Sequence, residues 1–257
     1  MVRKLRPGIR VEEFIPIEDP DDQGTYETWW GRARVHAKIH DPAKPFMLAN
    51  ELIGTRLAAA LGLPTLPGEI ARSFDGRNCW VTPRISESGT TSPPPATEAQ
   101  IAAEYPNVVA GMLAFDSWIH NVDRTADNVL FDPRLGVWLI DHENSLAEPD
   151  GRAFGRKADQ VAETPLASHP FVAAPLDPDE VRFWAGRIQI LSKHVIERPL
   201  EEANRRGLVT QEQAGWLLKY LLARRTMIVR LIPATGNVIK AVPHVGPGGD
   251  DDQYTLL

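Results

Sequence analysis

The sequence predicts an α+β fold in two lobes: a small N-terminal lobe of antiparallel strands with one helix, and a mainly α-helical C-terminal lobe. Strand and turn patterns dominate the first third of the chain, and helical periodicity dominates the last third. Between them, residues 86–97 are rich in Ser, Thr and Pro. We therefore expect lobes at 1–87 and 88–235 and a flexible tail at 236–257.

In the N-terminal lobe, strands are expected where short β-branched or aromatic runs lie between turn formers. Three such runs predict a small antiparallel sheet, the third continuing or pairing with the second: residues 11–17, 26–33 and 34–39. Apolar residues at helical spacing predict a helix over residues 46–61, which ends at Gly62 before Pro64. Two further runs on either side of a turn predict a hairpin: residues 68–74 and 79–85.

The C-terminal lobe is expected to consist mainly of helices. A helix over residues 98–119 should bend or restart at Pro106, and Thr210 with Gln213 forms a capping box in the helical region that ends at Pro233. Between these helical parts, a polar loop precedes two strands on either side of a tight turn: residues 120–128, 129–132 and 137–141, with the turn at 133–136. Residues 144–177 are expected to be irregular.

The composition excludes several classes of protein. The chain has 257 residues, 43% of them hydrophobic, which suffices for a substantial core without disulfides or structural metals. Its one cysteine, Cys79, cannot form a disulfide within the chain, and neither a signal-peptide pattern nor an apolar stretch of about 20 residues is evident. The net charge of −6 argues against binding nucleic acid by charge. We expect a cytoplasmic protein without membrane or direct nucleic-acid contacts.

The polar segment at residues 120–141 contains the groups that phosphoryl transfer requires. It places a carboxylate at Asp123, an amide at Asn128 and a second carboxylate at Asp141, at the end of a predicted strand. A carboxylate can orient an attacking hydroxyl and accept its proton, and Asn and Asp oxygens can hold Mg²⁺ beside nucleotide phosphates. Each residue alone could be a turn former or a strand cap, but the combined pattern favours the catalytic interpretation.

With these residues, the sequence resembles the protein-kinase-like superfamily and, within it, the HipA-like kinases. HNVDRTADN (residues 120–128) is similar to the catalytic loop of that group, and the LeuIleAsp that ends at Asp141 is similar to its metal-binding strand. Upstream, residues 35–39 resemble the strand with the nucleotide-anchoring Lys, and residues 49–54 resemble the helix with its paired Glu. The resemblance covers about residues 26–143 and implies a bilobal protein-kinase-like fold with nucleotide between the lobes.

The resemblance implies a role for each of five residues. Lys38 would contact the α- and β-phosphates of ATP, and Glu51 would hold Lys38 in place. Asp123 would be the catalytic base, while Asn128 and Asp141 would bind Mg²⁺. Without the downstream motif, Lys38 would be taken as a solvent-facing strand residue, and Glu51 could be a solvated helix position.

The chain departs from the family pattern at two places. Gly24 is the one glycine between the first two predicted strands, so the loop over the phosphates is expected at residues 21–27 without a GxGxxG motif. AspHisGlu at residues 141–143 replaces the AspPheGly of protein kinases. An AspxGlu pattern is common in small-molecule kinases that resemble aminoglycoside phosphotransferases.

Other polar residues near this segment are expected to support it. His120 should hydrogen-bond the loop backbone as a scaffold, and Arg124 should either neutralise a phosphate or tie down the loop. Asp116, Asp127 and Glu143 are candidates for groups that contact the proposed site residues.

The predicted function is Mg²⁺-dependent transfer of the γ-phosphoryl group of ATP to a hydroxyl group. The resemblance favours a serine/threonine kinase with a protein acceptor. A small-molecule or lipid-headgroup kinase, resembling aminoglycoside phosphotransferases or phosphatidylinositol kinases, would use the same residues, as would a nucleotidyl transferase that moves AMP. A nucleotide-binding pseudokinase is the alternative without catalysis. The sequence leaves open the acceptor, the oligomeric state and any toxin–antitoxin partner.

Overall fold

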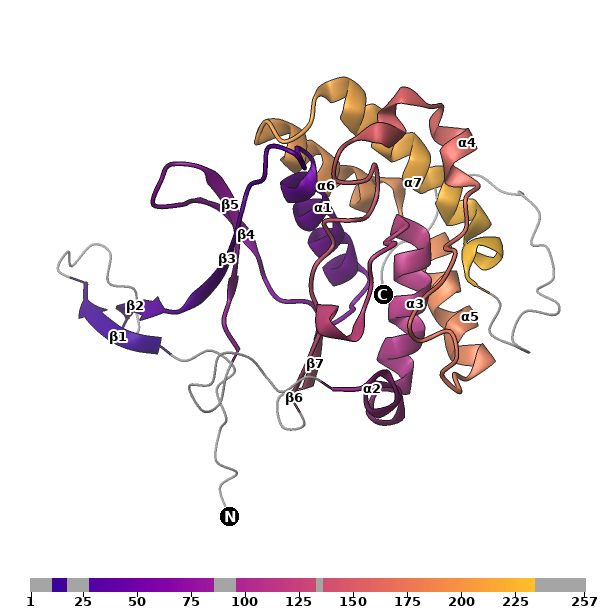
Figure 1. The fold of residues 1–257 in the computed structure, drawn as a ribbon, viewed down its shortest axis with the longest axis horizontal. Helices are drawn as coiled ribbons and strands as arrows, with labels where there is room; N and C mark the ends of the chain where they lie inside the picture. The colour runs from indigo at the N-terminus through magenta and orange to yellow at the C-terminus, as the bar shows by residue number, and fades with distance from the viewer. Residues whose placement is uncertain (1–10, 18–27, 86–95, 133–135, 234–257) are drawn as a thin grey trace, which may run out of the picture.

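The computed structural model describes residues 11–17, 28–85, 96–132 and 136–233. Within them, small antiparallel sheets occupy the N-terminal part of the chain and helices form most of the C-terminal part (Figure 1). Four predicted features lie largely or wholly outside the described residues: the phosphate loop at 21–27, the boundary stretch at 86–97, the turn at 133–136 and the tail at 236–257.

The N-terminal strands belong to two sheets. β1 (Val11–Pro16) pairs with β2 (Trp29–Ala33), whereas β3 (Val35–Ile39) pairs with β5 (Asn78–Pro83), which also pairs with β4 (Glu69–Arg72). The expected hairpin of β4 and β5 is confirmed. The expectation that the first three strands share one sheet is wrong, because only Arg34 separates β2 from β3. The tightest common hairpin loops have two residues, so β3 continues from β2 and pairs elsewhere.

Helix α1 (Met47–Ala60) confirms the predicted helix and lies between the three-stranded sheet and the C-terminal helices (Figure 1). Its side chains are apolar on most of its surface, so nearly every residue from Met47 to Ala58 is buried. Gly62 follows it with a φ of 78°, which suits a glycine at the end of a helix. Because α1 is enclosed in this way, it is a fixed support for the side chains that it carries toward the sheet.

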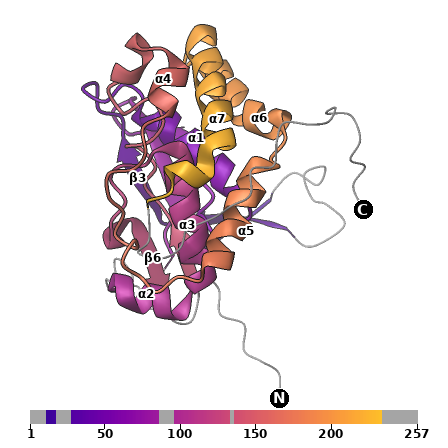
Figure 2. The ribbon, with the colours of Figure 1, turned by 90° about the vertical axis from the view of Figure 1, so that its right-hand side faces the viewer.

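The central helix of the C-terminal part is α3 (Pro106–Ile119), which follows α2 (Glu98–Glu104) after a break at Tyr105. Proline has no N–H to donate, so it fits the first turn of a new helix, and the predicted restart at Pro106 is confirmed. Helices α5 (Pro178–Gln189) and α7 (Gln211–Leu231) pack against α3 (Figure 2). The Trp118 indole N–H on α3 donates to the Leu221 carbonyl on α7 at 3.0 Å.

A two-stranded antiparallel sheet follows α3 and the polar loop. It consists of β6 (Val129–Asp132) and β7 (Gly136–Leu139). The expected strand over residues 137–141 therefore ends two residues early. Asp141 has a φ of 62°, a left-handed conformation that a β-strand does not contain, so the chain turns at this residue.

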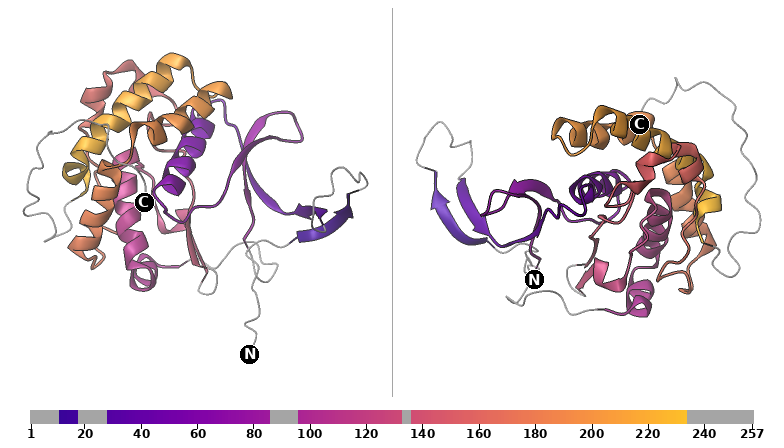
Figure 3. Two further views of the ribbon diagram at one scale, coloured as in Figure 1. Left: turned by 180° about the vertical axis from the view of Figure 1, so that it is seen from behind. Right: turned by 45° about the horizontal axis from the view of Figure 1, so that its top comes forward.

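The remaining helices confirm the predicted α-helical end of the described chain (Figure 3). They are α4 (Ala158–Ala162), α5 (Pro178–Gln189), α6 (Lys193–Arg205) and α7 (Gln211–Leu231). The Thr210–Gln213 capping box at the start of α7 is confirmed. Residues 144–177 are less irregular than expected, because they contain α4 and a 3₁₀ helix (Arg152–Gly155). Among the described residues, no helix is long and apolar enough to cross a membrane.

Gly54 allows α1 to approach the segment that follows β7. A Cβ atom added at Gly54 would lie 2.6 Å from the Cβ of His142, which is far too close for two carbon atoms. Glycine inside a helix normally costs about 1 kcal/mol relative to alanine. At Gly54, the absence of a side chain allows α1 to contact His142 closely.

Gly54→Ala is expected to lower the free energy of unfolding by about 1–3 kcal/mol, because the new methyl group overpacks the contact with His142. Gly215→Ala on α7 is the matched control, since nothing lies within 4 Å of its added Cβ. That variant should be neutral or gain about 0.5–1 kcal/mol from helix propensity. Urea unfolding of both variants measures the difference, and a Gly54→Ala protein as stable as wild type would contradict the close packing.

Candidate functional site

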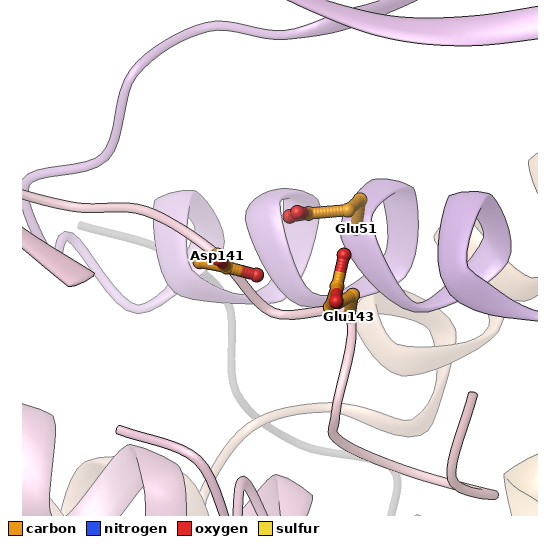
Figure 4. Close-up of side chains that lie close together, drawn as sticks. All are labelled: Glu51, Asp141 and Glu143. Carbon is orange, nitrogen blue, oxygen red and sulfur yellow. The ribbon is translucent and has the colours of Figure 1, made fainter. Parts of the chain in front are cut away.

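Lys38 on β3 lies among three carboxylates. Its Nζ is 2.6 Å from Glu51 Oε1, 2.7 Å from Asp141 Oδ1 and 3.0 Å from Glu143 Oε2. Figure 4 shows the three acidic side chains converging beside α1. Burial lowers the pKa of Lys38, but the charges of Glu51 and Asp141 outweigh it and hold that pKa well above its usual value. Lys38 is therefore a fixed positive charge that donates hydrogen bonds to Glu51 and Asp141 and forms a further ion pair with Glu143.

Glu51 is the buried member of this group, with 2% of its side chain exposed. Its second oxygen, Oε2, accepts the backbone N–H of His142 at 3.0 Å. Burial raises the pKa of Glu51, and the Lys38 charge and the His142 N–H act against the rise. A buried ion pair that loses one partner typically destabilises a protein by about 3–5 kcal/mol, so Glu51 and Lys38 depend on each other.

The segment at residues 141–143 is bound to α1 by more than Glu51. Asn50 on α1 is buried, and its Nδ2 donates to the Glu143 carbonyl at 2.7 Å. The Glu143 side chain pairs with Lys44 at 2.9 Å as well as with Lys38. Burial raises the pKa of Glu143, but the two lysines outweigh it and the pKa is lowered. Glu143 thus contacts the proposed site residues as expected, whereas no sequence signal pointed to Asn50 or Lys44.

Arg124 fixes the polar loop to its surroundings. Its Nε and Nη2 donate to Asp116 on α3 at 2.7 and 3.0 Å, in a pair that is almost completely buried. Its Nη1 donates to the carbonyls of Asn128 and Ile140 at 2.9 and 2.5 Å, and Nη2 lies 3.3 Å from His142 Nδ1. With its five N–H donors engaged, Arg124 ties down the loop, and of the two expected roles the structure supports this one.

Asp116 is held in the charged form at the centre of this network. Burial opposes its charge, but Arg124 and a hydrogen bond from His169, 3.1 Å away, outweigh burial and lower the pKa of Asp116 far below its usual range. The sequence pattern did not identify His169, which lies 53 residues from Asp116 in the chain.

Asp123 and Asn128 lie in the polar loop and are joined to each other. The Asn128 amide nitrogen donates to the Asp123 carbonyl at 2.7 Å, and the Asp123 carboxylate is exposed and accepts from Asn144 Nδ2 at 2.8 Å. The Ile140 N–H donates to the Asn128 carbonyl at 3.2 Å. Lys38 therefore contacts Asp141 directly. Asn128 does not contact Asp141 by this pairing, because its backbone partner is Ile140, the residue before Asp141.

A cavity of about 620 Å³ extends from Lys38. Its size is in the range of sites for small molecules and cofactors. Lys38, Glu51, Asp141 and the exposed Asp127 contribute to its wall. His36 and Arg84 also line it, and the rest of the wall is apolar side chains and threonines, including Trp80, Val129, Leu139, Thr55, Thr65 and Thr82. The charged group therefore lies at the wall of a mostly apolar cavity.

His120 ends α3 in a left-handed conformation, with a φ of 57°. Burial, together with the nearby charge of Arg224, lowers the pKa of His120 to about 4, although the hydrogen bond to the Pro165 backbone acts in the other direction. The expectation that His120 bonds the backbone of the polar loop is wrong, because its side chain bonds the backbone of Pro165 instead. Its scaffold role links α3 to the segment before α5.

Comparisons with known proteins bear on the fold. No family model and no curated protein matches the chain. The crystal structure of the Helicobacter pylori proinflammatory kinase CtkA is similar, with a TM-score of 0.52, 10% sequence identity, and coverage of 84% of this chain and 97% of that chain. A second solved structure, the Shewanella oneidensis MR-1 toxin–antitoxin complex of HipA, HipB and operator DNA, matches with a TM-score of 0.44 and 14% identity, covering 80% of this chain and 61% of that chain. The first similarity confirms the predicted resemblance at the level of the fold.

The titration of His120 gives a testable dependence of stability on pH. Because its folded pKa of about 4 lies below the ordinary value of 6.5, the unfolded chain binds the proton first as the pH falls. Stability is therefore lost between about pH 6.5 and pH 4 and is fully present above this range. His120→Asn, which tolerates the left-handed backbone, should lose less stability than wild type over this range.

Urea unfolding at several pH values measures this effect. His194→Asn, at an exposed position on α6, is the control for removal of a histidine. Equal acid sensitivity of wild type and His120→Asn would contradict the burial of a neutral His120.

Proposed function

We propose that the protein is an ATP- and Mg²⁺-dependent phosphotransferase that moves the γ-phosphoryl group of ATP to a hydroxyl group. The observation that carries this proposal is the contact of Lys38 with Glu51 and Asp141 at the wall of a cavity of about 620 Å³. A fixed cation for phosphates and a carboxylate for a metal thus lie together, and the polar loop adds an exposed carboxylate.

We propose that the cavity binds nucleotide between two lobes, with residues 1–87 as the nucleotide-binding lobe and 88–235 as the catalytic lobe. β3 and β5 line the cavity from the first lobe, and β6 and β7 line it from the second. The apolar wall suits a nucleobase, and Lys38 lies where the phosphates would need a cation.

The oxygen atoms of Asp141 and Asn128 suit Mg²⁺, which prefers oxygen ligands. The Asn128 amide nitrogen is committed to the Asp123 carbonyl, so Oδ1 is the atom of Asn128 that remains for a cation. Asp141 offers a partly exposed carboxylate at the cavity wall. When bound, Mg²⁺ would neutralise phosphate charge during transfer.

The chain's own residues divide the work of transfer. Lys38 would bind the α- and β-phosphates, and Glu51 would keep Lys38 directed into the cavity. The Asp123 carboxylate would accept the proton of the acceptor hydroxyl. The hydroxyl oxygen would then form a bond to the γ-phosphorus while the bond from that phosphorus to the departing ADP oxygen breaks. The acceptor that we propose is a Ser or Thr hydroxyl of a protein, met in the cytoplasm, as the resemblance to HipA-like kinases implies.

Nucleotide binding at Lys38 requires an exchange of partners. Its ammonium donates to Glu51 and Asp141 and pairs with Glu143, so a phosphate oxygen that binds Lys38 competes with one of these carboxylates. Glu51 is buried, and Glu143 is only 12% exposed and also holds Lys44. Asp141 is 28% exposed and lines the cavity. We therefore expect Asp141 to leave Lys38 and become free to bind the metal.

Asp141→Asn should bind ATP several-fold more tightly than wild type in EDTA, because the anionic competitor for Lys38 is gone. The same variant should lose turnover with Mg²⁺, because its metal ligand is weakened. Isothermal titration with and without metal measures both effects. If metal-free affinity is unchanged or lower, Asp141 is not the group that exchanges. Asp132→Asn, at the end of β6, is a control for loss of one negative charge.

Asp123→Asn should retain the fold and nucleotide binding but lower turnover by about 10²- to 10⁴-fold, the usual contribution of a general base. The measurement uses ATP labelled at the α- or the γ-phosphate, with lysate proteins and a panel of soluble hydroxyl compounds as acceptors. The proposal predicts label from the γ-position on protein Ser or Thr. Label from the α-position would indicate AMP transfer, and unchanged turnover of Asp123→Asn would refute the proposed base.

A further inference from the structure

Asn144, three residues after Asp141, contacts two consecutive residues of the polar loop. Its backbone carbonyl accepts the Val122 N–H at 3.4 Å, and its side-chain Nδ2 donates to Asp123 Oδ2 at 2.8 Å. An ionised carboxylate only accepts hydrogen bonds, so the amide nitrogen of Asn144 is the atom suited to this contact. Asn144 therefore holds both the backbone before Asp123 and the carboxylate of Asp123.

The segment that carries Asn144 is itself fixed at nearly every residue. His142 N–H donates to Glu51, and the Glu143 carbonyl accepts from Asn50. Beyond Asn144, the Ser145 hydroxyl donates to the His142 carbonyl at 2.6 Å, and the buried Leu146 donates its N–H to the Ile119 carbonyl at 2.7 Å. Asn144 thus extends from a rigid segment toward an exposed carboxylate.

We propose that Asn144 is a positioning residue for phosphoryl transfer, which sets the orientation of the Asp123 carboxylate relative to Asp141. This inference rests on the proposed function, because it gives Asp123 the role of base. With Oδ2 held by Asn144, Oδ1 of Asp123 remains for the acceptor hydroxyl. Because Asn144 and Asp141 belong to the same fixed segment, the base and the metal ligand keep one geometry with respect to each other.

A purely structural role for Asn144 predicts different behaviour. The hydrogen bond to Asp123 is exposed, and the typical net contribution of a hydrogen bond to stability is about 0.5–1.5 kcal/mol. The cavity wall and the Lys38 contacts do not include Asn144. Loss of its side chain should therefore affect turnover much more than stability or nucleotide binding.

The test compares Asn144→Ala and the isosteric Asn144→Asp, which keeps the shape and backbone contacts but cannot donate when ionised. ADP formation from MgATP gives kcat and KM, nucleotide affinity is measured by calorimetry, and thermal unfolding gives Tm. We expect kcat to fall about 10- to 100-fold in both variants, since small misplacements of reacting groups have effects of this size. KM should stay within about twofold, and Tm should fall by less than about 4 °C.

Asn107→Ala is the control for loss of an asparagine that donates to a carboxylate away from the cavity, because Asn107 Nδ2 donates to Glu180. Its Oδ1 also accepts from Trp184 Nε1, so this variant should lose at least as much stability as Asn144→Ala. Its kcat should equal that of wild type. The inference is overturned if either Asn144 variant keeps kcat within about twofold of wild type, or if kcat, nucleotide affinity and Tm all fall together. A wild-type protein that binds MgATP but forms no ADP would refute the proposed function, and the role of Asn144 with it.

Discussion

The buried ion pair between Arg124 and Asp116 is the interaction on which the geometry of the site depends. Asp116 belongs to the central helix α3, so the pair anchors the polar loop to the core of the helical part. The same guanidinium binds the carbonyls of Asn128 and Ile140, which lie on either side of the β6–β7 hairpin. Loss of one partner from such a pair leaves a buried charge, at a cost of about 3–5 kcal/mol. The loop and the segment with Asp141 are therefore held as one unit.

Charge balance around Lys38 connects this unit to α1. The buried Glu51 and the partly exposed Lys38 neutralise each other, while Glu51 also binds the backbone of the segment after β7. Asp141 is the more exposed partner of Lys38, and a phosphate oxygen would compete for the same N–H donor. Under the proposed function, nucleotide and metal binding are thus coupled: the ligand that takes Lys38 from Asp141 also frees Asp141 for the cation.

Local patterns in the sequence predicted most helices and strands, because helix caps, turn formers and apolar periodicity act over a few residues. Such patterns predicted α1, the restart at Pro106 and the capping box at Thr210. Pairing between strands depends on distant residues, so the partner of β3 was not predictable. The motif located Lys38 and Asp141, which the fold brings into contact across 103 residues of sequence. Asn50, Lys44 and His169 carried no local signal, because they are polar residues whose roles depend on tertiary contacts.

The most direct measurement of the central claim is a crystal structure of the protein with Mg²⁺ and a non-hydrolysable ATP analogue. The account predicts phosphate oxygens within hydrogen-bonding distance of Lys38 Nζ, and a metal ion bound by Asp141 and Asn128. It also predicts that the Lys38–Glu51 pair stays intact while the Lys38–Asp141 contact is broken. Nucleotide outside the cavity, or an unchanged Lys38–Asp141 contact with the phosphates elsewhere, would contradict the account.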